Sequence, residues 1–332
     1  MTQPFKHKVT VIGGGTGIFP VTQALQRLST DICSIIAVSD SGGSTGRIRD
    51  EFGFQPVGDL RQSLAALAED EAHTWIRQLL LYRFNKGSGL KGHNLGNLIL
   101  TALQDMTGST SEALFQAQRI FRIDGTVIPA TQQDVDLKIK YQDGTVVVGE
   151  DSLNEQSRPT KKIDRVSLVP NCRLSQPAKL AIQQAELIVI GPGDLYGSVL
   201  AALAPSGVRP AFKNSSAEVM YVVNLMTSAA QTHNMTAAQH LTEVEKAVGK
   251  RVDHVLINSA RIPPKVIKLY QANQEFPVED DLGNDQRAIR ADVISQVVHQ
   301  PSDQDNLKRS LLRHDSAKLE QVFAKLLKDT PV

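Results

Sequence analysis

Val9-Thr10-Val11-Ile12-Gly13-Gly14-Gly15-Thr16-Gly17 is the stretch that decides the fold. Strand-forming residues run into a glycine-rich turn, and apolar residues then return every three or four positions over 17–28, which predicts an amphipathic helix. Backbone N–H groups converge where a strand turns into a helix, the helix dipole favours negative charge there, and glycines allow a close approach. The turn therefore predicts a phosphate cradle formed by Gly13, Gly14, Gly15, Thr16 and Gly17.

Two familiar versions of such a turn are missing from the sequence. The strict dinucleotide-binding fingerprint that starts at Gly13 requires a glycine at position 18, where this chain has Ile18. The turn also lacks the Gly-Lys-Ser/Thr ending of a P-loop. A nicotinamide dehydrogenase is therefore the poorest of the functions considered, and a tight strand-to-helix turn without a ligand stays open as the alternative to a cradle.

The rest of the chain repeats the alternation of strands and helices. Strand-like runs at 34–38, 187–190, 219–223 and 255–257 are separated by helical patterns, among them 95–106, 111–121 and 237–248. This order predicts a single α/β domain over residues 1–332, with a doubly wound, mostly parallel, Rossmann-like sheet.

The middle of the chain predicts a different local structure. Runs at 125–129, 135–140 and 145–148 are strand-like, and Asp143-Gly144 is a good hairpin turn. We expect a small antiparallel β insertion at about 124–170, with an exposed polar loop at 151–162.

A second glycine-rich loop follows the second strand. Because the carboxyl ends of adjacent parallel strands form the ligand crevice, this loop should face the first one. Asp40 suits a ribose hydroxyl or a metal ion, while Ser44 and Arg47 suit a phosphate. The alternative for Arg47 is a solvated position at the start of a helix. The candidate residues of this loop are Asp40, Gly42, Gly43, Ser44 and Arg47.

Two further helix starts carry polar residues. Asp59 is interpreted either as an N-cap or as a ligand contact, and Arg61 is expected to be free to point at a phosphate. Before the helix at 95–106, Asn94 and Asn97 offer amides that suit a base edge or a sugar. His93 is more typical of a hydrogen-bonded structural histidine than of a catalyst, because no nucleophile or base lies nearby in the sequence.

A third glycine-rich loop follows the strand at 187–190 and comes before a helix. Gly191 and Gly193 make it another backbone cradle at the same edge of the sheet, followed by Asp194 and Tyr196. One such loop is weak support for a binding site. Three of them, together with the asparagines before 95–106, form a set that a structural protein has little reason to contain.

Together these segments resemble the CofD/YvcK family, whose members carry comparable motifs in the same order. The resemblance implies a Rossmann-like fold and one of two functions. One branch contains gluconeogenesis factors that bind UDP-N-acetylglucosamine and are needed for growth and cell shape on gluconeogenic carbon. The other branch contains metal-dependent 2-phospho-L-lactate transferases. The matching segments are 13–17, 40–47, 57–61, 92–97, 191–196, 221–227, 252–255 and 312–315.

The segments at 92–97 and 221–227, the second of which includes Asn224, look like the gluconeogenesis-factor branch. In that branch a tyrosine and an arginine near the C-terminus contact the UDP-sugar, and the resemblance assigns these roles to Tyr270 and Arg313. Ser41 stands where relatives have a second aspartate, so one natural Mg²⁺ ligand is missing. Asp194, which replaces a serine of the family, either compensates or caps the next helix. We therefore expect a UDP-sugar-binding regulator, with Mg²⁺ needed only in the transferase alternative.

Composition excludes several other classes of function. With 36 Lys and Arg against 35 Asp and Glu the net charge is +1, so no overall field attracts nucleic acid or an anionic membrane. The two cysteines have no metal-ligand spacing, no apolar run is long enough to span a bilayer, and the N-terminus has no signal-peptide pattern. We expect a cytoplasmic protein without a structural metal. Its protein partner and its homo-oligomeric state stay open.

Overall fold

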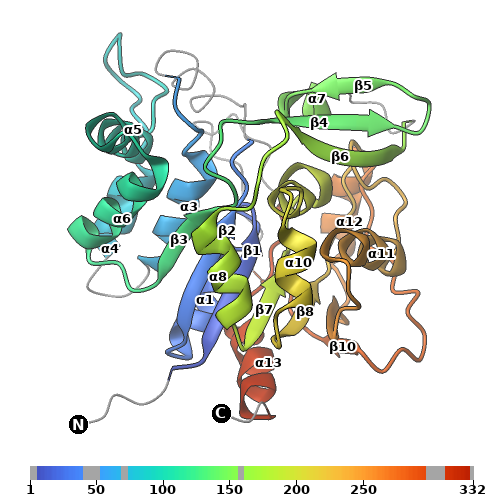
Figure 1. The fold of residues 1–332 in the computed structure, drawn as a ribbon. Coiled ribbons are helices and arrows are strands. Elements are labelled where there is room, and N and C mark those ends of the chain that lie inside the picture. The colour runs from blue at the N-terminus through green and yellow to red at the C-terminus, as the bar shows by residue number, and fades with distance from the viewer. Residues whose placement is uncertain (1–5, 40–52, 69–73, 156–160, 297–310, 330–332) are drawn as a thin grey trace.

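The computed structural model describes residues 6–39, 53–68, 74–155, 161–296 and 311–329, and in these residues seven mutually parallel strands form the central sheet (Figure 1). This confirms the predicted doubly wound α/β fold. In the order of the sheet the strands are β10 (Ala288–Ala291), β9 (His254–Asn258), β8 (Glu218–Val222), β7 (Leu187–Ile190), β1 (Lys8–Gly13), β2 (Asp31–Ile36) and β3 (Thr126–Pro129).

The central strands are apolar along almost their whole length. All four residues of β7 are buried, and in β1 the side chains of Val9, Val11 and Ile12 are at most 1% exposed. Both faces of these strands are therefore covered, as is usual for parallel sheets that lie between two layers of helices. This burial explains why the sequence of each strand is a continuous apolar run rather than an alternating one.

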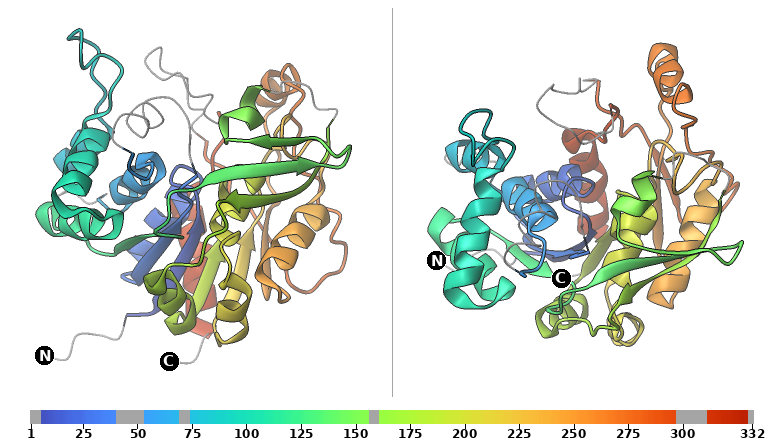
Figure 2. Two further views of the ribbon diagram at one scale, coloured as in Figure 1. Left: turned by 45° about the horizontal axis from the view of Figure 1, so that its top comes forward. Right: turned by 90° about the horizontal axis from the view of Figure 1, so that it is seen from above.

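Helices cover both faces of the sheet (Figure 2). α1 and α13 pack against each other on one face, while α8, α10 and α11 lie on the other. None of the helices in the described ranges has both the length and the apolar character that crossing a membrane requires. The helix bounds are α1 (Phe19–Arg27), α3 (Gly58–Leu67), α4 (Thr74–Leu81), α5 (Leu95–Thr107), α6 (Thr110–Phe121), α8 (Gln176–Gln184), the π-helical turn η2 (Leu195–Val199), α9 (Leu200–Leu203), α10 (Val208–Lys213), α11 (Ala237–Val248), α12 (Pro264–Gln271) and α13 (Ser316–Asp329).

The order in which strands are added to the sheet reverses at its middle, between β1 and β7. From β1 the chain continues to β2 and then β3 on one side, whereas β7 lies on the other side of β1 and leads on to β8, β9 and β10. The connections after β1 and β7 therefore diverge at the carboxyl edge of two neighbouring strands. In open α/β sheets a crevice forms at such a switch point, and it is the usual place for a ligand.

A second, antiparallel sheet confirms the predicted β insertion but begins later than the sequence suggests. Its strands lie in the order β5 (Val146–Val148), β4 (Asp136–Tyr141) and β6 (Ile163–Val169), and Gly144, with a φ of 87°, forms the turn between β4 and β5. The prediction is wrong for the run at 125–129, which contains β3 and pairs in parallel with β2. A strand-like run shows that a strand forms but not which sheet it joins.

The polar segment at 151–162 is not only a loop, as the sequence suggests. Asp151–Glu155 forms the short helix α7, and its Leu153 is fully buried. Leu153 and Glu150 both pack against Gly197 of η2, because a Cβ atom on Gly197 would lie 3.4 Å from each side chain. The β insertion therefore rests on the segment that follows β7.

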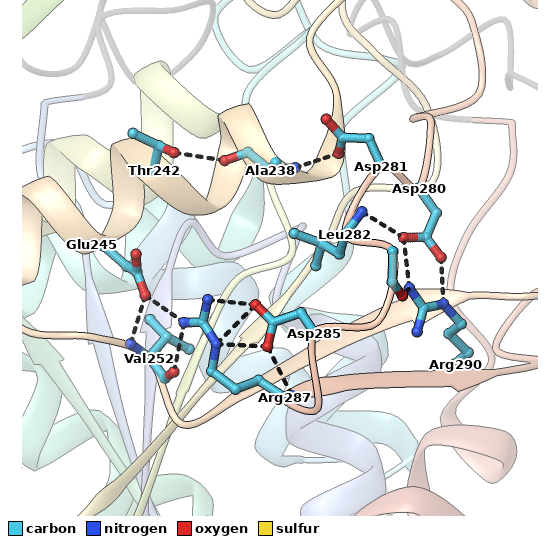
Figure 3. Close-up of polar contacts among 11 residues, drawn as sticks. Ala238, Thr242, Glu245, Val252, Asp280, Asp281, Leu282, Asp285, Arg287 and Arg290 are labelled. Atoms are coloured by element: carbon cyan, nitrogen blue, oxygen red, sulfur yellow. Dashed lines mark hydrogen bonds and ion pairs between the residues drawn. The ribbon is translucent and has the colours of Figure 1, made fainter.

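The edge strand β10 is held by ion pairs as well as by its backbone (Figure 3). Arg287, directly before β10, donates to Asp285 and to Glu245 of α11, each at 2.7 Å. Arg290, within β10, donates to Asp280 at 2.6 Å. Because β10 lacks a run of β-branched residues, the sequence does not predict this strand.

Candidate functional site

The first and third glycine-rich loops lie against each other at the switch point. A Cβ atom on Gly17 would collide with the carbonyl of Pro192 and lie 2.6 Å from the Cα of Gly193. A Cβ atom on Gly13 would lie 3.9 Å from the Cα of Gly191. The loops pack so closely that there is no room for a side chain at Gly17. The structure thus brings together two of the three loops that the sequence assigns to one crevice.

The start of α3 completes this corner of the crevice. The carbonyl oxygen of Asp59 lies where a Cβ atom of Gly15 would stand. A Cβ atom on Gly14 would lie 2.8 Å from the carboxylate of Asp59 and 2.6 Å from the hydroxyl of Ser198. Val57 is the N-cap of α3, so Asp59 does not cap its own helix. Its carboxylate faces the first loop instead, which favours the second of the two interpretations of Asp59.

The first loop offers amide groups to an anion. Within the described residues, the N–H groups of Gly15, Thr16 and Gly17 donate to no other residue. Thr16 is exposed, and α1 begins directly after this loop without a side-chain cap at Ile18. Open N–H groups at the start of a helix bind phosphate well, because the helix dipole adds to their own polarity. The geometry fits the predicted cradle.

Side chains from β8 and beyond hold the third loop in place. Asn224 donates to the Gly193 carbonyl at 2.8 Å and accepts from the Gly193 N–H at 3.3 Å. Gln231, which is 8% exposed, accepts from the N–H groups of Tyr196 and Gly197 at 3.2 and 3.1 Å. The amide of Asn224, which the resemblance places in the site, therefore positions the loop.

Asp194 presents a carboxylate at the end of the third loop. Asp194 is an exposed residue. Protein atoms packed around its carboxyl group raise the pKa of that group above the usual range, and a hydrogen bond with Gln231 opposes the shift. The Asp194 side chain does not cap η2, so the capping interpretation of this residue is wrong.

The side chain of Tyr196 faces the β insertion. It is 4% exposed; burial raises the pKa of its hydroxyl, and the carboxylates of Glu243 in α11 and Asp164 in β6 add to the shift. These neighbours place the phenol ring between the insertion and α11. Among the residues predicted for the third loop, Tyr196 therefore has a side chain that packs inside the protein rather than facing the crevice.

A second polar cluster lies where α3 meets the start of α5. Asn94 is the N-cap of α5 and accepts from the N–H of Asn97 at 3.1 Å. Arg61 is 5% exposed, donates to the Leu80 carbonyl at 3.0 Å and packs against Gly96. One nitrogen of the Arg61 guanidinium thus binds the protein itself, so Arg61 is less free to point at a phosphate than the sequence suggests.

His93, directly before this cluster, does not match the expected structural histidine. Its Nδ1 is buried and makes no hydrogen bond with the part of the chain that the structure describes. Buried ring nitrogens in folded proteins normally have a partner. His93 therefore stays a candidate contact for a ligand.

The second glycine-rich loop, with Asp40, Gly42, Gly43, Ser44 and Arg47, lies outside the described residues. In the ranges that are described, no group of three or more His, Cys, Asp or Glu side chains could hold a metal ion. A magnesium ion on a nucleotide needs only one or two carboxylates besides phosphate oxygens. Asp59, whose carboxylate lies against the first loop, and Asp194, which ends the third loop, are the carboxylates that could serve this role.

The C-terminal segment folds back to the same edge of the sheet. The N–H of Leu312 donates to the hydroxyl of Tyr270 at 2.8 Å. His314 is 8% exposed and forms a hydrogen bond with the backbone of Val223, which directly follows β8. Tyr270 itself is 5% exposed, so its hydroxyl fixes the backbone next to Arg313. The structure thus places the segment that carries Arg313 beside Tyr270 and next to the carboxyl end of β8. Contact of these two residues with a UDP-sugar stays a prediction.

A pocket of about 220 Å³ opens next to the third loop. It lies at the carboxyl ends of β8 and β9, and its mainly apolar wall includes the polar residues Asn224, Asn258 and Arg261. A larger hollow, of about 580 Å³, lies at the opposite edge of the sheet between Arg251 and Arg287. Carboxylates already bind Arg287 there. We therefore take the smaller pocket, which shares Asn224 with the third loop, as part of the candidate site.

Three residues that shape the site are absent from the sequence-based prediction. Gln231 carries no local motif, and only the fold brings it to the third loop. Ser198 ends the glycine-rich stretch 191–198, but only the fold brings its hydroxyl to the first loop. His314 lies beside Arg313 in the segment 312–315, so its position did carry a signal. The family resemblance of this segment indicated Arg313 as the functional residue. In the structure, His314 is the residue that joins the segment to the end of β8, through its hydrogen bond with the Val223 backbone.

Comparisons with known proteins show which family this chain resembles. The sequence profile of the family described as 2-phospho-L-lactate transferase CofD matches residues 9–299. A gluconeogenesis factor of Bacillus subtilis is 35% identical over 327 residues, which cover 98% of this chain and 99% of the relative. A gluconeogenesis factor of Halalkalibacterium halodurans is 35% identical over 320 residues, which cover 96% of both chains. A crystal structure of a Bacillus halodurans protein matches with a TM-score of 0.86 and 33% identity, covering 96% of this chain and 100% of that one.

Proposed function

This chain belongs to the CofD family, and from that premise we propose that it is a gluconeogenesis factor that binds UDP-N-acetylglucosamine in the crevice between β1 and β7. In this proposal the chain regulates growth and cell shape on gluconeogenic carbon sources. It responds to the UDP-sugar without consuming it.

The observation that carries the proposal is the row of amides from Gly15 to Gly17. They lie at the switch point of the sheet and donate to no other residue in the described ranges. A diphosphate bound there would be held by backbone N–H groups and the dipole of α1. The sugar or the base would then extend toward the pocket beside Asn224, whose amide fixes the neighbouring wall.

The relatives support the regulatory part of the proposal. Two proteins that match this chain over nearly their whole length carry the name gluconeogenesis factor. The segments that bear the candidate site all lie within the matched length. The identity of the sugar nucleotide comes from the family resemblance of Tyr270 and Arg313. The hydrogen bond of Tyr270 to the N–H of Leu312, the residue before Arg313, supports a shared role for the two.

Calorimetric titration tests the proposal directly. UDP-N-acetylglucosamine, UDP-glucose, GTP and a deazaflavin are titrated separately, each with Mg²⁺ and with a chelator. We expect UDP-N-acetylglucosamine to bind most tightly and the chelator to change its affinity little, because backbone amides rather than a metal hold the phosphates. Preferred binding of GTP or of the deazaflavin would contradict the proposal.

A metal-dependent transferase similar to 2-phospho-L-lactate transferase is the second candidate. The family description favours it, as do the carboxylate of Asp59 beside the first loop and that of Asp194 at the end of the third loop. Those two groups would hold Mg²⁺, which would neutralise charge on the transferred group. Binding that disappears in chelator, together with a phosphoester product that Asp194→Asn no longer forms, would establish this function instead.

A further inference from the structure

The pocket beside the third loop is too small for a whole sugar nucleotide. Its volume of about 220 Å³ lies below the roughly 300–1,000 Å³ of pockets that enclose a drug-sized ligand. It therefore holds one part of such a ligand, a single ring with its substituents. If the amides at 15–17 bind the diphosphate, the part in the pocket is either the base or the sugar.

The two asparagine side chains in the wall of this pocket already bind the backbone. Asn224 donates to the carbonyl of Gly193 and accepts from its N–H. Asn258, at the end of β9, donates to the carbonyl of Ala260 at 2.8 Å and accepts from its N–H at 3.2 Å. Each amide is therefore held in one orientation by the loop that it stabilises, and neither is free to turn toward the edge of a base.

Arg261 gives the pocket its charge. It is the only charged residue among the described residues of the wall, it is exposed, and it forms no ion pair with the part of the chain that the structure describes. A guanidinium has several N–H donors and no acceptor. Much of the remaining wall is apolar and includes the buried residues Leu225, Ile257 and Ile262. The pocket thus suits a group with an acceptor oxygen and an apolar end.

This wall suits an acetamido group better than a uracil base. The edge of uracil has an N–H flanked by carbonyls, and a buried N–H without an acceptor lowers affinity about ten- to hundredfold. An acetamido group ends in a carbonyl oxygen, which accepts from a guanidinium, and in a methyl group, which packs on apolar side chains. Its N–H lies next to the sugar ring, at the mouth of the pocket, where water reaches it.

On the premise of the proposed function, we propose that this pocket binds the N-acetylated sugar ring of the UDP-sugar. Arg261 donates to the acetamido carbonyl oxygen, and the apolar wall covers the methyl group. UDP-glucose has a hydroxyl at that position, which lacks the methyl group and does not extend as far. Arg261 therefore determines which sugar the site prefers.

Helix α12 connects the pocket to a residue that the resemblance assigns to the ligand. Its first residue, Pro264, and its Ile267 both lie in the wall of the pocket. Tyr270 lies further along the same helix and accepts a hydrogen bond from the N–H of Leu312. The pocket and Tyr270 therefore share one element, which supports a common ligand.

Calorimetric titration of UDP-N-acetylglucosamine, UDP-glucose and UDP tests the role of Arg261. Arg261→Met keeps an apolar stem and removes the donors, so it should weaken binding of UDP-N-acetylglucosamine about tenfold and leave UDP-glucose and UDP unchanged. Lys265→Met is the matched control, because Lys265 is an exposed cation at the start of α12 that is not part of the wall. It should bind all three ligands like the wild type. Equal weakening of all three ligands by Arg261→Met would overturn the inference, because Arg261 would then bind the diphosphate.

A variant that narrows the pocket distinguishes the sugar from the base. Ala260 lies in the wall next to Arg261, and Ala260→Leu adds a side chain there. It should weaken binding of both UDP-sugars at least tenfold and leave that of UDP unchanged, because UDP has no group in the pocket. A similar loss for UDP would show that the pocket holds the base, and would overturn the inference.

The same titrations separate this inference from the proposed function. A wild type that binds none of the three ligands would contradict the proposed function and the inference together. A wild type that binds UDP-N-acetylglucosamine, with an Arg261→Met variant that binds it equally well, would overturn the inference alone.

Discussion

The backbone carbonyl of Asp59 fills the space in which Gly15 would carry a Cβ atom. Gly15 is therefore needed for two reasons. Without a side chain it lets a ligand come close to the backbone N–H groups of the first loop, and it lets the start of α3 approach that loop. The sequence suggests the first reason, whereas only the structure reveals the second.

This contact predicts that Gly15→Ala destabilises the fold. The added Cβ atom would collide with the Asp59 carbonyl, and backbone shifts of this kind cost about 1–3 kcal/mol. Thermal unfolding should show a clear fall in the midpoint for Gly15→Ala. Gly89→Ala serves as the control, because a Cβ atom there would meet nothing within 4 Å. An unchanged midpoint for Gly15→Ala would mean that α3 is free to move away from the loop.

The parts of the fold that the sequence predicts well have local signals at both ends. The helix at 237–248 is predicted at its observed bounds, because Thr236 forms a capping box and Gly249 ends the helix with a φ of 74°. β7 matches equally well, since Gly191 follows its apolar run directly. β10 has no such signals at its ends. Ion pairs of Arg287 and Arg290 with distant residues stabilise it instead.

In the candidate site, too, the sequence predicts the local features and misses the contacts between distant segments. The glycine-rich loops are local patterns, and the parallel sheet alone places the first and third loops side by side. Contacts between distant segments, such as Gln231 with Asp194 and Tyr270 with Leu312, leave no pattern in either segment. Such contacts follow from how the elements pack, which periodicity does not reveal.

The position of Gln231 beside Asp194 predicts that a negative charge placed there weakens ligand binding. Gln231→Glu keeps an oxygen for the N–H groups of Tyr196 and Gly197, but it places a second carboxylate against Asp194. The added negative charge should weaken UDP-N-acetylglucosamine binding about tenfold, and more at low salt, because it repels the diphosphate. Calorimetry at two salt concentrations measures both effects.

Gln239→Glu is the matched control for this charge change. Gln239 completes the capping box of α11, and a glutamate serves that role equally well. The control variant therefore adds the same charge at an exposed position and should bind like the wild type. Equal losses of affinity in the two variants would show that overall charge, rather than Asp194, governs binding.

The burial of His314 predicts that acid destabilises the protein. Burial lowers the pKa of this histidine from 6.5 to about 4, although its hydrogen bond to the Val223 backbone opposes the shift. Between these two values the unfolded chain binds a proton that the folded chain does not, so the free energy of unfolding falls as the pH falls from 6.5 to 4. The loss from this one residue is on the order of 3 kcal/mol.

Urea unfolding of the wild type and of His314→Gln at several pH values measures this contribution. The variant cannot take up the proton, so the difference in stability between the two proteins should change by that amount across the window. Carboxylates titrate in both proteins, and their contribution cancels in the difference. A difference that is constant with pH would show that His314 titrates alike in the folded and unfolded states.

The hydrogen bond between Leu312 and Tyr270 predicts how the C-terminal segment takes part in binding. Arginine can hold a diphosphate through charge-assisted hydrogen bonds worth about 1.5–3 kcal/mol, so Arg313→Ala should weaken UDP-N-acetylglucosamine binding about ten- to hundredfold. Tyr270→Phe leaves the buried N–H of Leu312 without its acceptor, which costs about 1–3 kcal/mol and loosens the backbone beside Arg313.

If Tyr270 acts through Arg313, the two substitutions should not add. Tyr270→Phe should weaken binding in the wild-type background but cause little further loss in the Arg313→Ala background. Calorimetric titration of the four proteins of this double-mutant cycle gives the coupling between the two residues. Full additivity would show that the Tyr270 hydroxyl contacts the ligand independently of Arg313. Wild-type affinity in both single variants would show that the C-terminal segment is not part of the site, and the UDP-sugar would then be held by the glycine-rich loops alone.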